Sequence, residues 1–428
     1  MKIMTVGQFR EEKNSLSGIP DNSAEIDKTV LDIIQDVRDS GDAALFRYTA
    51  EFDGVDLEQL AVSPEEFTEA RSAVSDSLMT ALKQAQENIA AFHKNQKEKS
   101  WFTNRADGVI LGQQVTPLEN AGIYVPGGKA AYPSTVLMNV IPAKLAGVGK
   151  ICITTPPDSD GKISPEVLMA AKLTGVDEVY KLGGAQAIAA LAYGTESVEK
   201  VAKIVGPGNA FVARAKKWVY GDVAIDMIAG PSEICVVADE TAQPEFAAAD
   251  LLSQAEHDEQ ARAICITVSQ ALAEKISKSV SHQTGQLERK EIIQKSLDAN
   301  GKIILANNLS EAFDVVNEIA PEHLQLMIEN PGEKLGMVQN AGAIFLGNYA
   351  PEPLGDYFAG PNHTLPTSGT AVFSSPLGVY DFVKKSSIIQ YSRQALHKAS
   401  DSIITLANAE GLTAHANSIQ VRKDVNDA

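Results

Sequence analysis

Short apolar runs alternate with longer helical patterns from Gly122 onward, and this alternation limits the folds that the chain can adopt. The first such runs are residues 151–155, 176–182 and 201–205, and helical periodicity separates them, as in residues 165–175. Strands that alternate with helices usually form parallel sheets with helices on their faces. The alternation resumes after Gly230-Pro231-Ser232, so we expect two α/β units, one on either side of this break.

Helical segments are also expected outside these two units. Residues 24–50 carry helical periodicity, and Ser63-Pro64-Glu65-Glu66 is a typical helix start, from which one helix is expected to run to about Lys94. Residues 350–378 are rich in proline and glycine and predict a long irregular loop. Two further helices are expected after Tyr391.

Composition excludes several classes of partner. The chain has 428 residues and is long enough for two or more domains. Its formal net charge of −18 argues against binding to nucleic acid or to an anionic membrane surface. No apolar run approaches the roughly 20 residues of a membrane span, and the N-terminus has no signal peptide, so a cytoplasmic protein is expected. Cys152, Cys235 and Cys265 lie in apolar runs and are expected to be buried thiols.

Gln254 and His257 lie near the end of a helical segment that begins at Pro244. Residues three apart share one face of a helix, so the amide oxygen and the imidazole can reach one point. Such a pair would make half of a metal site. A solvated pair at a helix end gives the same pattern, and the two interpretations stay open on this feature alone.

Three glycine-rich turns follow strand-like runs in the first unit, and the last two lead directly into helical segments. These turns are Pro126-Gly127-Gly128, Gly183-Gly184-Ala185-Gln186 and Gly206-Pro207-Gly208-Asn209. Backbone N–H groups at a helix N-terminus attract phosphate, and glycine lets the phosphate come close. None is a complete dinucleotide motif, and structural turns are the alternative. All three turns occupy the same place, directly after a strand, and this favours a nucleotide cleft at the carboxyl ends of the strands.

The adjacent pair Glu322-His323 follows another helical segment. A carboxyl group and an imidazole are suited to general base catalysis, because the pKa of each can be shifted towards neutrality. An exposed polar turn is the alternative. His363 and His415 also lie in turn-rich or helix-end settings, whereas His93, His282 and His397 lie in polar helical segments and are expected on the surface.

Taken together and in order, these motifs resemble the histidinol dehydrogenase family, and the resemblance covers essentially the whole chain. The motifs that carry it are Tyr124-Val125-Pro126-Gly127-Gly128, Gly183-Gly184-Ala185-Gln186-Ala187, Gly206-Pro207-Gly208-Asn209-Ala210-Phe211-Val212, Ala229-Gly230-Pro231-Ser232-Glu233, Asp250-Leu251-Leu252-Ser253-Gln254-Ala255-Glu256-His257, Pro321-Glu322-His323-Leu324 and Gly360-Pro361-Asn362-His363-Thr364-Leu365-Pro366-Thr367.

The resemblance implies an enzyme that uses NAD for the four-electron oxidation of L-histidinol through L-histidinal to L-histidine, the final steps of histidine biosynthesis. One zinc ion in each active site would position the substrate. The implied zinc ligands are Gln254, His257, Asp356 and His415. Of the implied catalytic pair, His323 would remove protons and Glu322 would activate water in the second oxidation.

The resemblance also implies residues that contact the two small molecules. The substrate would contact Ser232, Gln254, His257, His323, Asp356, His363, Glu410 and His415. NAD would contact Tyr124, Gln186 and Asn209, which lie on or beside the glycine-rich turns described above. A relative that oxidises another amino alcohol or a small diol is an alternative, as is a non-catalytic metal- or nucleotide-binding protein. His363 and Glu410 favour histidinol, and Glu322-His323 favours catalysis.

The implied fold is α/β, with two incomplete Rossmann-like parallel-sheet domains, an N-terminal helical segment and a C-terminal helical dimerisation tail. We expect an N-terminal arm over residues 1–20 and a larger domain with the metal and catalytic residues over 21–124 and 234–377. Residues 125–233 would form a smaller NAD-binding domain. Residues 378–428 would cross to the partner in a homodimer, so that Glu410 and His415 would come from the other subunit.

Overall fold

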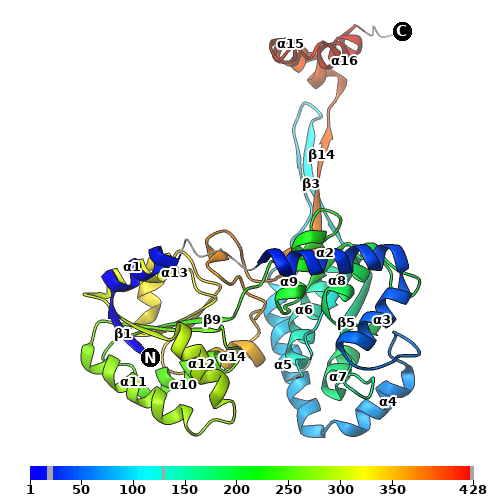
Figure 1. Ribbon diagram of the computed structural model, residues 1–428. Coiled ribbons are helices and arrows are strands. Elements are labelled where there is room, and N and C mark those ends of the chain that lie inside the picture. The colour runs from blue at the N-terminus through cyan, green and yellow to red at the C-terminus, as the bar shows by residue number, and fades with distance from the viewer. Residues whose placement is uncertain (17–22, 128–130, 425–428) are drawn as a thin grey trace. The chain divides into compact units, whose positions relative to one another are not determined.

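The structure, a computed structural model, describes residues 1–16, 23–127 and 131–424 (Figure 1). It divides into two compact units. Unit 1 comprises Met1–Gln96 and Leu118–Phe382, and unit 2 comprises Lys97–Pro117 and Val383–Ala428. Within the described ranges, no helix has both the length and the apolar character that crossing a membrane requires.

The larger sheet of unit 1 has six strands, all paired in parallel, in the order β1-β11-β10-β9-β12-β13. Their bounds are β1 (Lys2–Thr5), β9 (Glu233–Ala238), β10 (Arg262–Thr267), β11 (Lys302–Leu305), β12 (His323–Met327) and β13 (Ala343–Leu346). Successive residues of β9 face opposite sides of the sheet and both sides are apolar: Val236 joins one core cluster and Val237 the other. Because helices cover both faces, the residues that face either side are apolar, and the strand appears in the sequence as a continuous apolar run.

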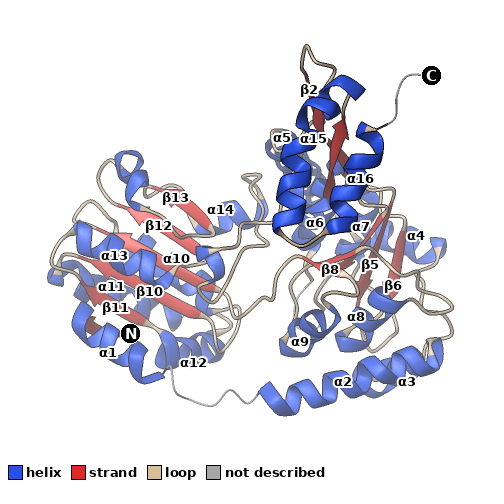
Figure 2. Cartoon of the chain, turned by 90° about the horizontal axis from the view of Figure 1, so that it is seen from above, coloured by secondary structure: helices blue, strands red, loops and turns tan. Residues whose placement is uncertain are grey.

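Helices cover both faces of this sheet (Figure 2). One face packs against α10 (Pro244–Ala255), α11 (Gln270–Thr284) and α12 (Lys290–Asn300), and the other against α1 (Val6–Leu16) and α13 (Leu309–Ile319). The first strand, β1, pairs with β11, so the N-terminal residues complete the edge of the sheet.

The smaller sheet of unit 1 has five parallel strands in the order β6-β5-β4-β7-β8. Their bounds are β4 (Asn120–Tyr124), β5 (Lys150–Thr155), β6 (Glu178–Lys181), β7 (Lys203–Val205) and β8 (Ala224–Ile225). One face packs against α4 (Pro64–Ala73), α5 (Asp76–Lys94), α6 (Pro133–Ala146) and α7 (Pro165–Thr174). The other packs against α2 (Ser23–Ser40), α3 (Asp42–Phe52), α8 (Gly184–Tyr193) and α9 (Ala210–Val219).

Helices α2 to α5 pack against the smaller sheet. The domain boundaries expected from the sequence instead place residues 21–124 with the larger sheet. The apolar face of α2, which includes Val30 and Ile33, shares a core cluster with α8 and α9 on the smaller sheet. The single helix expected from Ser63 to Lys94 is also two helices. Ser75 accepts a hydrogen bond from the Leu78 N–H at 3.2 Å, so a second N-cap interrupts the helical pattern.

Residues 350–378 are mostly irregular, as predicted, but they contain the short helix α14 (Glu352–Tyr357) and the 3₁₀ turn η2 (Thr370–Val372). Two further 3₁₀ segments lie nearby, η1 (Pro331–Met337) and η3 (Val379–Phe382). Helix α14 matters most for function, because it carries two carboxylates of the candidate site.

Unit 2 contains a three-stranded antiparallel sheet in the order β14-β3-β2 and two helices that pack against each other. The elements are β2 (Trp101–Asn104), β3 (Ile110–Pro117), β14 (Val383–Gln390), α15 (Arg393–Ala409) and α16 (Thr413–Lys423). The predicted α/β class, the two parallel sheets and the helical C-terminal tail are confirmed, whereas this antiparallel sheet was not predicted.

Candidate active site

The predicted catalytic pair lies at the amino end of β12, an interior strand of the larger sheet between β9 and β13. Helix α13 ends at Ala320, which has a positive φ of 50°, and β12 begins at His323, directly opposite Ile234 of β9. Glu322 and His323 are both buried. The pair is therefore held by the core rather than exposed in a polar turn.

The backbone of Glu233 positions both side chains of the pair. Its N–H donates to Glu322 Oε2 at 2.8 Å, and its carbonyl oxygen accepts a hydrogen bond from His323 Nδ1 at 3.0 Å. Because Nδ1 donates, the proton of a neutral ring lies on Nδ1 and Nε2 carries the lone pair. Nε2 is buried and has no hydrogen-bond partner among the described residues. The ring is thus oriented so that Nε2, whenever the ring is neutral, is the nitrogen that can accept a proton.

The pKa values of the pair are shifted by burial and by neighbouring charge. Burial raises the pKa of Glu322 to about 7. Burial alone would lower the pKa of His323, but the carboxylates of Glu322, Asp356 and Glu352 outweigh it and raise this pKa to about 10. His323 Nε2 lies 3.7 Å from Asp356 Oδ1 and 3.9 Å from Glu352 Oε1, so these are close charges rather than hydrogen bonds.

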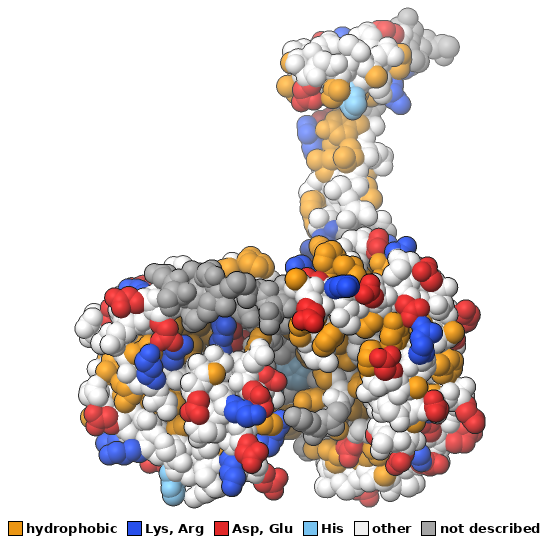
Figure 3. Space-filling model, in the orientation of Figure 1, with side chains coloured by type: hydrophobic (Ala, Val, Ile, Leu, Met, Phe, Trp, Pro, Cys, Tyr) orange, Lys and Arg blue, Asp and Glu red, His pale blue; other side chains and the backbone are white. Residues whose placement is uncertain are grey.

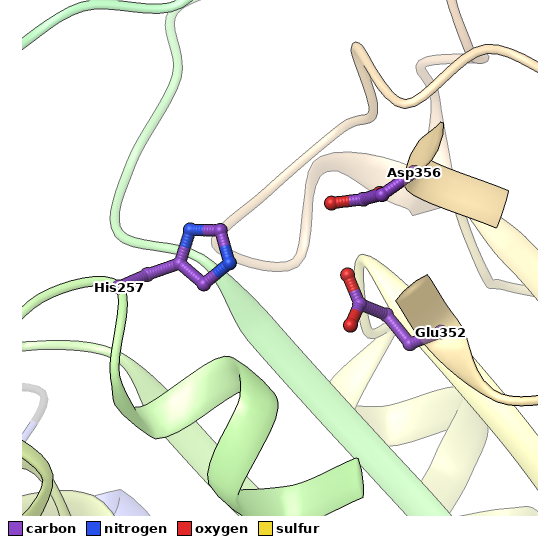
Figure 4. A group of neighbouring side chains, drawn as sticks. All are labelled: His257, Glu352 and Asp356. Atoms are coloured by element: carbon purple, nitrogen blue, oxygen red, sulfur yellow. The ribbon is translucent and has the colours of Figure 1, made fainter. Parts of the chain in front are cut away.

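A group of three side chains, here called the cation cluster, lies beside His323 Nε2. It consists of His257, Glu352 and Asp356, each of which offers one ligand atom, and the three atoms lie within 4.8 Å of one another (Figure 4). His257 follows the last turn of α10, and the two carboxylates lie on one face of α14 because they are four residues apart. Nitrogen and carboxylate oxygen donors suit zinc and similar divalent metals.

Two buried oxygen atoms, one on Gln254 and one on Glu352 of the cation cluster, have no hydrogen-bond partner among the described residues. The Gln254 residue is 1% exposed, and its Oε1 is buried without a hydrogen-bond partner among the described residues. Glu352 accepts a hydrogen bond from Ser253 Oγ at 3.1 Å through Oε2, while its Oε1 has no such partner there. Buried polar atoms are almost always paired, so these two oxygens fit a site that holds a cation.

Charge in the cation cluster is unevenly distributed. Burial, followed by the nearby Asp356 carboxylate, raises the pKa of Glu352 to about 8. Burial would also raise the pKa of Asp356, but His323 and His363 outweigh it and hold this pKa below its usual range. Burial lowers the pKa of His363, and desolvation by neighbouring groups lowers that of His257, although the His257 residue itself is exposed. Neutral imidazoles are the form that binds metals.

The other predicted substrate residues fall in both units. His363 is half-buried, and its Nδ1 donates to the Asp356 carbonyl oxygen at 3.1 Å. Ser232 directly precedes β9 and therefore adjoins Glu233. Glu410 follows α15, and His415 lies in the first turn of α16, so both belong to unit 2. The structure thus brings His257, His323, Asp356 and His363 together and places Glu410 and His415 in unit 2.

The three glycine-rich turns lie at the carboxyl ends of β4, β6 and β7 of the smaller sheet. Tyr124 is buried and its hydroxyl accepts a hydrogen bond from the Gly184 N–H at 3.1 Å; burial raises the pKa of this phenol to about 12. Gln186 is buried in α8, and its Oε1 has no hydrogen-bond partner among the described residues. Asn209 caps α9 and accepts from the Val212 N–H at 3.1 Å. Gly128 of the first turn lies outside the described residues.

Comparison with known proteins identifies the family. The family model described as Histidinol dehydrogenase matches residues 19–423. The chain belongs to the histidinol dehydrogenase family. It is 55% identical over 428 residues to the histidinol dehydrogenase of Oceanobacillus iheyensis, with 100% of both chains covered. It is 56% identical over 424 residues to that of Listeria monocytogenes, with 99% of each chain covered.

A solved structure in this family has the same fold. The crystal structure of histidinol dehydrogenase from Elizabethkingia anophelis is 40% identical and covers 99% of this chain and 98% of that chain, with a TM-score of 0.94. Histidinol dehydrogenases oxidise histidinol to histidine with NAD in histidine biosynthesis. Family membership makes the chain an oxidoreductase and confirms the resemblance inferred from the motifs.

Sequence reasoning missed one member of the cation cluster, Glu352. The segment from residue 350 was predicted to be irregular, although Glu352 and Asp356 have the i,i+4 spacing of one helical face and Pro351 directly precedes them. That spacing, next to a proline at a helix start, was the available signal. The predicted thiols are confirmed: Cys152, Cys235 and Cys265 are buried and free.

Proposed function

We propose that this histidinol dehydrogenase family member catalyses the NAD-dependent four-electron oxidation of L-histidinol through L-histidinal to L-histidine, with zinc positioning the substrate. The observation that carries the proposal is the buried Nε2 of His323, which has no partner among the described residues and lies beside the cation cluster. Family membership supplies the substrate. We also infer a cytoplasmic enzyme, which the three free thiols support and cell fractionation would test.

Gln254, His257 and Asp356 of unit 1 would hold the zinc, and Glu352 lies close enough to take part. His415 would be the remaining ligand. When bound, the zinc would orient the amino alcohol of the substrate. Its charge would also offset the adjacent carboxylates that raise the pKa of His323, so that the neutral imidazole becomes available as a base. The unpartnered oxygens of Gln254 and Glu352 support this ligand set.

In the first oxidation, His323 Nε2 would accept the proton of the substrate hydroxyl while hydride leaves the same carbon for NAD. The products are the aldehyde, NADH and a proton on the imidazole. The Glu233 carbonyl oxygen fixes the opposite ring nitrogen, so the accepting nitrogen does not need to reorient. Burial of the ring keeps competing water away from it.

In the second oxidation, water would add to the aldehyde carbon, Glu322 would take a proton from that water, and protonated His323 would return its proton to the aldehyde oxygen. A carboxyl group with a pKa of about 7 is well matched to this task near neutral pH. Neutral again, His323 would then remove a hydroxyl proton from the hydrate while hydride leaves for a second NAD, which gives the carboxylic acid of histidine; this acid then loses its proton to solvent. His363 and Ser232 are proposed to contact the substrate in both steps.

NAD is proposed to bind at the carboxyl ends of the smaller sheet, in contact with Tyr124, Gln186 and Asn209. Backbone N–H groups at the start of α8 and α9 would face its phosphates. The unpartnered oxygen of buried Gln186 and the position of Asn209 at the start of α9 support this assignment.

The enzyme is proposed to be a homodimer in which Glu410 and His415 complete the active site of the other subunit. Unit 2 supports this proposal because it exposes several large apolar side chains, and Figure 3 shows hydrophobic side chains gathered along this part of the chain. Their exposed fractions are Trp101 51%, Phe102 55%, Ile389 72% and Leu406 66%. Exposed apolar patches of this kind mark interfaces. Mixing inactive subunits tests whether the active sites are shared.

Glu322→Gln is expected to slow the oxidation of histidinal at least about 100-fold and that of histidinol less than about tenfold, because only the aldehyde step needs a base for water. Glutamine can still accept the hydrogen bond from the Glu233 N–H, so the backbone contact remains. The two steps are measured separately, with each substrate and NAD. Equal slowing of both steps would contradict this division of roles.

A further inference from the structure

A buried ion pair contacts the turn Gly206-Pro207-Gly208-Asn209, one of the turns proposed to bind NAD. Lys216, on α9, and Asp226, just after β8, form this pair, with side chains 2% and 1% exposed. Neither residue belongs to the catalytic pair or the cation cluster. Burying two charges is costly, and replacing such a pair with well-packed apolar residues is often neutral or stabilising. A stable fold alone therefore does not account for these two residues.

The pair holds both polar atoms of one glycine. Lys216 Nζ donates to the Gly206 carbonyl oxygen at 2.9 Å, and the Gly206 N–H donates to Asp226 Oδ2 at 2.8 Å. The two side chains come from different elements, α9 and the segment after β8, so the carbonyl oxygen and the N–H of this residue are both fixed. The backbone of Asp226 is in turn anchored to the smaller sheet, because its N–H donates to the Ile204 carbonyl oxygen at 3.2 Å.

Gly206 has a conformation and surroundings that leave no room for a side chain. Its φ is +111°, and a Cβ atom there would lie 2.1 Å from the Tyr124 carbonyl oxygen. The next residues lead to Asn209, whose side chain caps α9. The position of Gly206 therefore determines where the N-terminus of α9 and Asn209 lie relative to Tyr124.

We propose that Lys216 and Asp226 are positioning residues for NAD. The two side chains hold Gly206 so that the turn before α9 presents Asn209 and the backbone N–H groups of the turn to the cofactor phosphates. The proposal rests on the NAD site proposed above. The pair carries no net charge, so it does not attract the phosphates itself. The effect of the pair is geometric, and misplacement of a binding group by about 1 Å can lower the rate of an enzyme roughly 100-fold.

The double variant Lys216→Met/Asp226→Leu tests this role, because it removes both charges and leaves neither one buried alone. We expect the KM for NAD to rise about 10- to 100-fold, with kcat changed less than about threefold. The KM for histidinol and the zinc content should stay unchanged. Lys217→Met is the matched control, since Lys217 is the exposed neighbour on the same helix and should leave both KM values as they are.

Calorimetric titration of NAD into the purified variants separates this proposal from the proposed function, because it does not require histidinol to be oxidised. Weaker NAD binding by the double variant supports the positioning role. An unchanged NAD affinity, or equal losses in kcat and in both KM values, would overturn it.

Should the double variant not fold, Asp226→Asn takes its place. The amide oxygen of the substituted side chain would keep an acceptor for the Gly206 N–H, while the charge opposite Lys216 would be lost. An increase of about three- to tenfold in the KM for NAD is therefore expected, and no increase would overturn the proposal.

Discussion

His257→Ala is expected to release the zinc and to lower the affinity for the metal at least about 100-fold. Mutation of a residue that only supports a metal ligand typically lowers metal affinity or activity 10- to 100-fold, and mutation of a direct ligand should lower metal affinity at least as much. His257 supplies the nitrogen of the cation cluster, whose other two members are carboxylates. Its loss would leave the cation cluster with oxygen donors alone and His415 as the one proposed nitrogen ligand, a set less suited to zinc.

The measurement is the zinc content per subunit after dialysis, together with the rate of NAD reduction. His282→Ala is the control, because His282 is an exposed histidine on α11 and lies outside the cation cluster. The control should retain both metal and activity. Stoichiometric zinc in the dialysed His257→Ala protein would contradict the ligand assignment, whatever the activity of that protein.

His323→Ala is expected to lower the rate of both oxidations about 100- to 10,000-fold, the range typical of a lost general base. The variant should keep its zinc, because Nε2 of His323 is a neighbour of the cation cluster and not a member of it. His415→Ala should also be inactive, but through loss of metal. The two variants therefore fail for different reasons.

Mixing the two inactive variants tests whether the active sites are shared between subunits. In a heterodimer one site would combine intact His323 with intact His415, and the other would lack both. Random association in a twofold dimer should then restore about a quarter of the wild-type activity. No recovery, with heterodimers shown to form by mass spectrometry, would contradict the shared site.

Periodicity and turn chemistry were sufficient to predict most of unit 1. The continuous apolar run of β9 predicts a strand covered on both faces, and the glycine-rich turns lie, as predicted, at the carboxyl ends of strands of the smaller sheet. The ligand set was reached only through the resemblance to the family. The spacing of Gln254 and His257 alone could not distinguish a metal site from a solvated helix end.

Other features could not be predicted because their signal depends on tertiary contacts. The six-residue α14 is too short to show periodicity, and its Glu352 was overlooked for that reason. The strands β2 and β14 are largely exposed on both faces, so they lack the alternation of apolar and polar residues that marks a strand. His93, expected on the surface, is fully buried, and its Nδ1 lies 2.7 Å from Gln96 Oε1.

The central claim is that one metal-dependent site carries out both oxidations of histidinol, and counting products tests it most directly. Purified protein is supplied with L-histidinol and excess NAD, and NADH and histidine are quantified together. The proposed function predicts two molecules of NADH for each histidine formed, loss of both products after the zinc is removed by a chelator, and recovery when zinc is returned. One NADH for each histidinol consumed, with the aldehyde as the final product, or full activity in the metal-free protein would contradict it.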